Sequence, residues 1–168
     1  QTNIHEVLER VLPLLNSVQN TPEALALNQP VQLIRDYDLS LPELSADPNL
    51  LIQVVLNISM NALQALTEQA LTSARLPRQI TFRTRIQRAF TIHGICHRSV
   101  IRLDIEDNGP GIPPALLESV FYPMVTGRAK GTGLGLSIAQ DIMQLHKGLI
   151  ECQSVAGRTV FSLFLPWE

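Results

Sequence analysis

Apolar residues in the first part of the chain recur with the spacing of one helix face. Between Ile4 and Val18 they fall three or four positions apart, which predicts an amphipathic helix that bends at Pro13. A short apolar run at residues 31–37 then predicts a strand. The segment between them, residues 20–30, contains Pro and Asn and is typical of a connection.

A second and longer helix is predicted to begin at Asp47-Pro48, because Asp is favoured at the N-cap and Pro at the first helical position. Its apolar residues lie on nearly every side, which indicates a buried helix. We expect it to end at about Glu68 or slightly beyond. A polar loop precedes it at residues 40–46, and residues 67–79 are expected to form a mobile loop.

The second half of the chain alternates between apolar and polar positions and predicts four strands. Two of them are joined by a turn at His93-Gly94, and two helices lie between the strand pairs. The predicted elements are strands at 80–92 and 99–106, a short helix at 113–121, a helix at 133–146 with Gly148 as its C-cap, and strands at 149–154 and 159–165. This order predicts an α+β fold with a mixed or antiparallel sheet that carries its helices on one face.

Three polar residues, Gln53, Asn57 and Asn61, interrupt the apolar surface of the long helix. They are spaced four apart, so they form one stripe. Short amides are unfavourable in helix interiors and costly when they are buried without partners. The stripe therefore either faces solvent or lines a pocket, where amide oxygens would suit a hard cation such as Mg²⁺.

The strand at 99–106 directs a carboxylate inward where it ends. Asp107 has the parity of the apolar side chains before it, which share the buried face of the strand. Asn108-Gly109-Pro110-Gly111 allows a tight turn and lets a flat ligand approach bare backbone. An ordinary turn is the alternative, because Asp-Asn-Gly is favoured turn chemistry.

A glycine-rich segment precedes the helix predicted at 133–146. Gly131, Gly133 and Gly135 alternate there, and free N–H groups at a helix N-terminus bind anions. Arg128 and Lys130 add positive charge just before them, although a flexible loop is the alternative. The amide stripe, the inward carboxylate and this phosphate cradle are together the three parts that a Mg²⁺-nucleotide needs.

Composition narrows the class of protein. The length of 168 residues predicts one domain. The net charge of -2, without a cluster of basic residues, argues against nucleic-acid binding. Cys96 and Cys152 lie far apart, as expected for a reduced cytoplasmic compartment. No apolar run approaches the roughly 18 residues of a membrane span. Because the chain begins with Gln1, we expect a piece of a longer protein.

These segments, in this order, resemble the ATP-binding catalytic domain of sensor histidine kinases, in the GHKL superfamily that includes gyrase and MutL. The resemblance implies a two-layer α/β sandwich of the Bergerat type, with a mixed, mostly antiparallel sheet, a flexible ATP lid at about 122–130, and one ATP-binding catalytic domain over residues 1–168. The matching segments are 47–62 (N box), 107–112 (G1 box), 121–123 (F box), 131–136 (G2 box) and 157–166 (last strand). Residues 33–38, 41–44 and 121–128 are similar to the nitrogen-regulation sensor kinases of the NtrB type.

The resemblance implies ATP and Mg²⁺ as cofactors and a role for each site residue. Asn61 would bind Mg²⁺ and Asn57 would support metal and phosphate, both as catalytic residues. Asp107 would accept a hydrogen bond from the adenine amino group, with Thr159 near that carboxylate. Further nucleotide-binding positions are Gly109, Gly111, Ile112, Phe121 at the lid, Arg128, Lys130, Gly131, Thr132, Gly133, Leu134, Gly135 and Leu136. Gln64 departs from the basic residue that many histidine kinases carry beside the N box.

The same resemblance implies the partners and leaves two alternatives open. The acceptor histidine would lie on a separate dimerisation domain, because His5 lacks the expected sequence around it. The response regulator NtrC and the PII signal protein are the other implied partners. A GHKL ATPase is disfavoured, because its general-base glutamate is replaced by Asn57, which cannot accept a proton at neutral pH. A module that binds nucleotide only to switch a partner surface is the other alternative.

Overall fold

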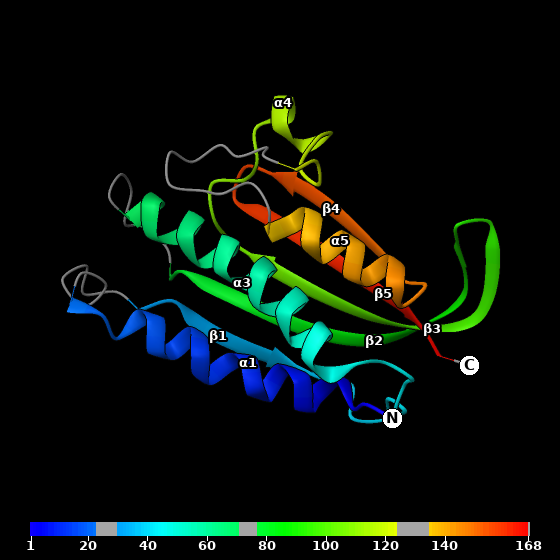
Figure 1. The fold of residues 1–168 in the computed structure, drawn as a ribbon. Helices are drawn as coiled ribbons and strands as arrows, with labels where there is room; N and C mark the ends of the chain where they lie inside the picture. Colours follow the sequence, from blue (N-terminus) through cyan, green and yellow to red (C-terminus); the bar gives the residue numbers. More distant parts are fainter. Residues whose placement is uncertain (23–29, 71–76, 124–134, 168) are drawn as a thin grey trace.

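The computed structural model describes residues 1–22, 30–70, 77–123 and 135–167, and these form a two-layer α+β fold (Figure 1). One layer is a five-stranded sheet, and helices pack on one of its faces. The elements in chain order are α1 (Ile4–Gln19), β1 (Gln32–Asp36), α3 (Pro48–Ala70), β2 (Gln79–Ile92), β3 (Ile95–Asp107), α4 (Pro114–Leu117), α5 (Gly135–Leu145), β4 (Leu149–Val155) and β5 (Arg158–Pro166). The predicted α+β class, with helices on one face of a mixed sheet, is confirmed.

The sheet has the strand order β1-β2-β3-β5-β4. β1 pairs with β2 in parallel, and the other three pairs are antiparallel. Because β5 is inserted between β3 and β4, the end of β3 lies beside the start of β5. Asp107 is therefore directly opposite Thr159, which in turn is opposite Ser154 of β4.

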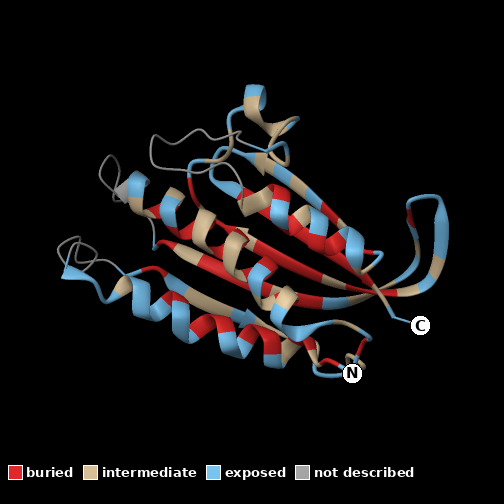
Figure 2. Cartoon of the chain, in the orientation of Figure 1, coloured by how far each residue is buried: buried red, intermediate tan, exposed pale blue. Residues whose placement is uncertain are grey.

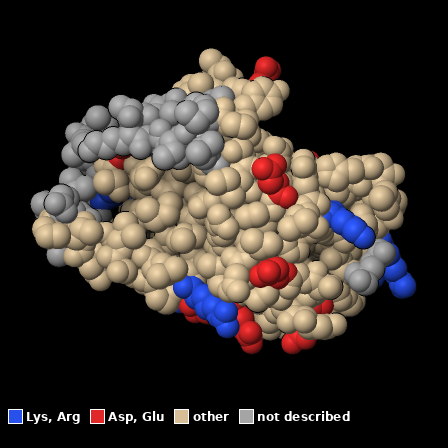
Figure 3. Space-filling view, in the orientation of Figure 1, with Lys and Arg blue, Asp and Glu red and all other residues tan. Residues whose placement is uncertain are grey.

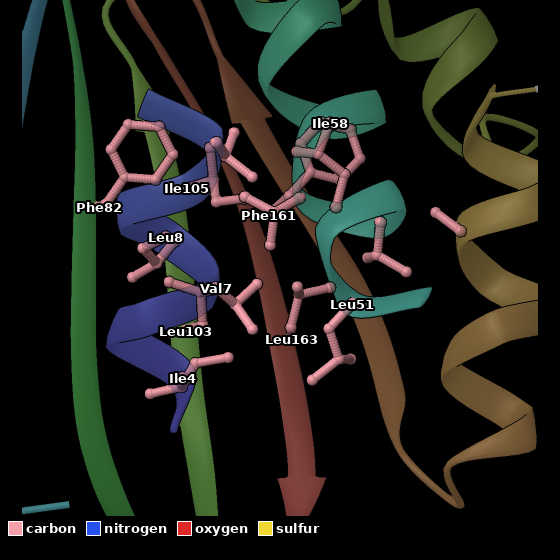
Figure 4. Packing of buried hydrophobic residues seen from close by; sticks show 14 of the residues in the cluster. Ile4, Val7, Leu8, Leu51, Ile58, Phe82, Leu103, Ile105, Phe161 and Leu163 are labelled. Atoms are coloured by element: carbon pink, nitrogen blue, oxygen red, sulfur yellow. The ribbon is translucent and has the colours of Figure 1, made fainter. Parts of the chain in front are cut away.

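The core lies between the sheet and the three long helices (Figures 2 and 4). Alternate residues of β3 are buried on the helix side, and β5 presents an apolar row to the same space. The residues that meet there include Ile4, Val7, Leu8, Leu51, Ile58, Phe82, Leu103, Ile105, Phe161 and Leu163. This shared core holds α3, which carries the amide stripe, at a fixed position over the sheet.

The start of α3 confirms the predicted N-cap. Asp47 Oδ1 accepts hydrogen bonds from the backbone N–H groups of Asn49 and Leu50, at 2.9 and 3.3 Å. The helix continues to Ala70, so the loop predicted from residue 67 onward is wrong for 67–70. Leu66 is completely buried, so packing on the core favours a helix that continues past residue 66. Residues 71–76 of that predicted loop lie outside the described residues.

α3 is also the one described helix that is long and apolar enough to cross a membrane by length and composition alone. Its apolar sides pack on the sheet, on α1 and on α5. This packing is typical of the central helix of a globular core.

Two predicted boundaries in the second half of the chain are corrected. β3 begins at Ile95 rather than at Ser99, because His93 and Gly94 have φ values of 48° and 80° and close a tight two-residue hairpin turn. Pairing therefore resumes immediately after the turn. α4 spans only four of the residues predicted as helix at 113–121, and none of its side chains is buried, so no apolar face extends it.

The end of α5 also differs from the prediction. The left-handed residue is Lys147, with a φ of 57°, rather than Gly148. Gly148 N–H donates to Met143 O at 2.8 Å and Lys147 N–H to Gln144 O at 2.9 Å, the two bonds of a Schellman motif. Glycine is needed at 148 for close packing instead, since a Cβ there would lie 2.6 Å from the carbonyl oxygen of Phe164.

Candidate functional site

A buried carboxylate stands where β3 ends. The side chain of Asp107 lies on the helix side of the sheet, as the strand parity predicts, and the residue is 5% exposed. Its Oδ1 atom accepts a hydrogen bond from the backbone N–H of Gly109 at 2.9 Å. Thr159, opposite it on β5, is also buried. The sheet therefore presents a charged acceptor and a hydroxyl side by side at one end.

The turn after Asp107 is packed too closely for side chains at its two glycines. A Cβ on Gly111 would lie 2.5 Å from the carbonyl oxygen of Val155, and Gly111 also has a φ of +87°. A Cβ on Gly109 would lie 2.8 Å from the carboxylate of Asp107. Asn108 ties the turn to the start of β2, because its side chain bonds to the backbone of Pro77 and Gln79. Bare backbone therefore borders the carboxylate.

The amide stripe of α3 connects this turn to the start of α5. Of the three residues in the predicted stripe, Asn57 and Asn61 are half-buried, whereas Gln53 is exposed. Gln53 therefore faces solvent, and only the two asparagines are placed to line a pocket. Asn57 Nδ2 donates to the carbonyl of Gly135 at 3.2 Å. Ala65, the next residue of the same stripe, lies 3.8 Å from the position of a Cβ on Gly109. From Asn57 to Ala65 the helix rises about 12 Å.

Asn57 and Asn61 therefore line a strip that has the carboxylate turn at one end and a helix N-terminus at the other. A helix N-terminus attracts anions, and the carboxylate end suits a donor group of a ligand. Amide oxygens suit Mg²⁺, which retains several waters and takes further oxygens from phosphates. Among the described residues no group of three or more His, Cys, Asp or Glu side chains could hold a metal ion.

The remaining predicted site residues lie around this strip or outside the described residues. Ile112 and Phe121 are half-buried, and the Phe121 ring packs edge-on against Phe161 with 6.1 Å between the ring centroids. Gly135 and Leu136 form the first turn of α5 and are half-buried. The predicted lid spans 122–130, and only its first two residues, Tyr122 and Pro123, are among the described residues. The rest of the lid lies in the segment 124–134, outside the described residues. The same segment contains the predicted site residues Arg128, Lys130, Gly131, Thr132, Gly133 and Leu134.

Two residues of β4 belong to the site although sequence reasoning missed them. Ser154 Oγ accepts a hydrogen bond from Ile112 N–H and is 2.7 Å from the hydroxyl oxygen of Thr159. Burial raises the pKa of the Cys152 thiol to about 12, and the charge of Asp107 acts in the same direction. The only signal in the sequence is parity, since both residues share the inward face of β4 with Ile150.

Two of the four histidines, His5 and His146, join elements of the fold away from this site. His5 Nε2 is 2.9 Å from the hydroxyl oxygen of Thr84, and its ring stacks on Tyr37. His146 accepts from Asp47 N–H through Nε2 and contacts the carbonyl of Ile142 through Nδ1, so it joins the end of α5 to the start of α3. On the face seen in Figure 3, the described charged residues are scattered rather than gathered in one patch.

Comparisons with known proteins agree with this architecture. The family described as histidine kinase-, DNA gyrase B-, and HSP90-like ATPase matches residues 46–168. The chain is 49% identical over 164 residues to the sensory histidine kinase/phosphatase NtrB of Salmonella typhimurium, and it covers 43% of that relative. It is 35% identical over 164 residues to NtrB of Rhodobacter capsulatus, of which it covers 42%. Each alignment includes 98% of this chain but only 43% or 42% of the relative, so the chain spans less than half the length of these relatives.

Solved structures share the fold. The nucleotide-free catalytic domain of the histidine kinase ThkA superposes with a TM-score of 0.74 at 24% identity, and the match covers 99% of this chain and 93% of that domain. Full-length ShkA in complex with AMPPNP has a TM-score of 0.70 at 22% identity, and the match covers 99% of this chain and 30% of ShkA. At these identities the likeness shows the fold alone.

Proposed function

We propose that this chain, which belongs to the family of histidine kinase-, DNA gyrase B-, and HSP90-like ATPases, binds Mg²⁺-ATP and transfers the γ-phosphoryl group to a histidine of a separate domain. The observation that carries the proposal is the buried carboxylate of Asp107, bordered by the bare turn at Gly109 and Gly111. The 49% identity to NtrB supports a place in nitrogen-regulation two-component signalling.

Asp107 recognises the base in this proposal. Its carboxylate accepts a hydrogen bond from the exocyclic amino group of adenine, a position where guanine carries a carbonyl oxygen. The hydroxyl of Thr159, opposite Asp107 on β5, lies at the same edge of the base. The absence of a side chain at Gly111 lets the flat ring approach the backbone. Ile112 and Phe121 contribute apolar contacts.

The amide stripe and the segment before α5 hold the phosphates. Asn61 supplies the protein oxygen for Mg²⁺, and Asn57 supports metal and phosphate while it bonds to Gly135. Asn61 and Asn57 would hold Mg²⁺ beside the phosphates, where the bound ion would supply neutralisation of phosphate charge. Positive charge and free backbone N–H groups around the phosphates come from Arg128, Lys130 and the segment Gly131, Thr132, Gly133, Leu134, Gly135 and Leu136. The length of the stripe, about 12 Å, suits a ligand with its base at one end and its phosphates at the other.

Hydrolysis of ATP by water is less well supported. Asn57 stands where an ATPase of this superfamily would need a carboxylate base, and an amide cannot take up a proton at neutral pH. Its amide nitrogen is moreover engaged with the carbonyl of Gly135. The nucleotide is therefore proposed as a phosphoryl donor to a protein side chain.

The similarity to NtrB supports a proposal for the whole protein, its partners and its location. Residues 1–168 form the ATP-binding catalytic domain of a longer kinase in this proposal, and the partners are its own dimerisation and phosphoacceptor domain, a response regulator of the NtrC type and a PII signal protein. These partners are proteins, and the proposal includes neither nucleic acid nor a membrane. The proposed location is the cytoplasm.

Nucleotide titration by calorimetry tests the base assignment. We expect Asp107→Asn to weaken Mg²⁺-ATP binding and to leave GTP binding nearly unchanged, because only adenine donates to this carboxylate. A lost hydrogen bond to a charged group costs about 1.5–3 kcal/mol, or roughly a 10- to 150-fold change in Kd. The exposed Gln53→Ala on α3 is the control. Equal losses for both nucleotides would contradict the assignment.

Phosphoryl transfer to a separately expressed acceptor domain distinguishes the kinase from a module that only binds nucleotide. We expect the unmodified chain to transfer phosphate and Asn61→Ala to lose transfer while it keeps its circular dichroism spectrum, since the side chain orients metal rather than packing the core. Transfer by Asn61→Ala at the unmodified rate would refute the metal role. No transfer by the unmodified chain would favour the binding module.

A further inference from the structure

We propose that Ser154 is a positioning residue of the nucleotide site: its hydroxyl orients the hydroxyl of Thr159 and fixes the turn after β3. The inference rests on the proposed function, because it assigns to Ser154 a part in recognising the amino-bearing base. None of the segments that resemble the N, G1, F and G2 boxes contains this residue. Ser154 lies on the edge strand β4, and the pairing of β4 with β5 brings its side chain to the site.

The register of three strands places Ser154 in line with the base-recognition residues. Ser154 of β4 is opposite Thr159 of β5, and Thr159 is opposite Asp107 of β3. Paired residues point to the same face of a sheet, so the three side chains form one row on the helix side. Ser154 is half-buried at the open end of this row, while Thr159 and Asp107 are buried.

Two hydrogen bonds join Ser154 to the turn and to Thr159. A backbone N–H can only donate, so the 2.7 Å contact from Ile112 N uses a lone pair of Ser154 Oγ. Either hydroxyl can donate in the 2.7 Å contact between Ser154 Oγ and Thr159 Oγ1. In this proposal Ser154 is the donor, because the Thr159 proton is then directed toward the side where β3 carries the negative charge of Asp107. This arrangement sets donor and acceptor at the edge of the base.

Ser154 also determines how closely the turn approaches the sheet. Gly111 lies so near the end of β4 that a Cβ would be 3.3 Å from Ser154 Oγ and 2.5 Å from Val155 O. The bond from Ile112 N–H holds the turn at this separation. Without the hydroxyl the turn can shift away from β4, which changes the slot beside Asp107 that a flat ring would enter.

The test compares two nearly isosteric variants, Ser154→Thr and Ser154→Val, which differ in one hydroxyl group. Both side chains are β-branched, suit a strand and have nearly the same volume, so the comparison isolates the effect of the hydroxyl group. We expect Ser154→Thr to bind Mg²⁺-ATP within about twofold of the unmodified chain. Ser154→Val and Ser154→Ala should bind about 5- to 30-fold more weakly, the change for one or two lost hydrogen bonds. The neighbouring exposed Gln153→Ala is the control.

Two further readouts separate positioning from a structural role. In phosphoryl transfer to the acceptor domain, Ser154→Val should raise KM for ATP by the same factor and leave kcat unchanged. The loss of affinity in Ser154→Val should be greater for ATP than for GTP, because GTP does not use the row formed by Ser154, Thr159 and Asp107. A loss of kcat, or equal losses for both nucleotides, would overturn the positioning role.

Asp107→Asn, measured in parallel, distinguishes failure of the inference from failure of the proposed function. If Asp107→Asn loses ATP affinity while the Thr and Val variants bind equally well, the inference is wrong and the proposed function stands. If Asp107→Asn retains full ATP affinity, the proposed base site is wrong and the inference falls with it. If Ser154→Ala does not fold, the pair Ser154→Thr and Ser154→Val decides alone.

Discussion

Replacing Gly111 by Ala should destabilise the fold through two separable effects. The first is conformational, because Gly111 has a φ of +87°, which side-chain-bearing residues rarely adopt. The second is steric, because the new Cβ would lie 2.5 Å from the carbonyl oxygen of Val155 and 3.0 Å from its carbonyl carbon. Both of these atoms are backbone, so the clash is relieved only by moving β4 or the turn.

Gly157 offers a matched control for the first effect. It has the same φ of +87°, but a Cβ there would meet no atom within 4 Å. A left-handed residue with a Cβ costs about 1–2 kcal/mol, partly offset by the lower entropy of the unfolded chain. Overpacking adds about 1–3 kcal/mol. We therefore expect Gly157→Ala to lose about 1 kcal/mol and Gly111→Ala about 2–4 kcal/mol.

Urea unfolding followed by circular dichroism measures both losses, provided that the m value is the same in all three proteins. In a thermal scan the difference between the two variants should appear as about 2–4 °C for each kcal/mol in a domain of this size. The nucleotide titration should also show weaker ATP binding for Gly111→Ala and unchanged binding for Gly157→Ala. Equal destabilisation by the two substitutions would refute the close approach of the turn to β4.

Two further predictions concern side chains with shifted pKa values. Cys96 is exposed, whereas burial raises the pKa of Cys152 to about 12, so a thiol reagent near neutral pH should label Cys96 quickly and Cys152 slowly. Rapid labelling of Cys152 in Cys96→Ser would contradict its burial. Burial lowers the pKa of His5 from its ordinary value of 6.5, so the unfolded chain binds that proton more readily than the folded chain. The contribution of neutral His5 to the free energy of unfolding is therefore fully present above pH 6.5. It is lost as the pH falls below 6.5 and through the lowered pKa of His5 in the folded chain. His5→Gln should flatten the pH dependence of the urea midpoint between about pH 7.5 and pH 5.5, and an unchanged slope would contradict this.

Local chemistry in the sequence determined the elements and the positions of several site residues. Asp47-Pro48 starts α3 because the cap acts on the backbone two and three residues later. His93-Gly94 makes the hairpin turn from its own backbone angles. The inward direction of Asp107 follows from strand parity alone. Each of these features depends on neighbours within a few residues, so a pattern along the chain is sufficient to predict it.

Only the tertiary structure decided which of these residues meet. Asn57 bonds to Gly135, 78 residues away, and Ser154 bonds to Ile112, 42 residues away. The insertion of β5 between β3 and β4 creates the row from Asp107 to Ser154. Packing likewise required a glycine at Gly148, where the sequence indicated a helix cap. Such contacts are set by strand order and by the approach of backbones across the core, and the periodicity of a single segment carries no information about either.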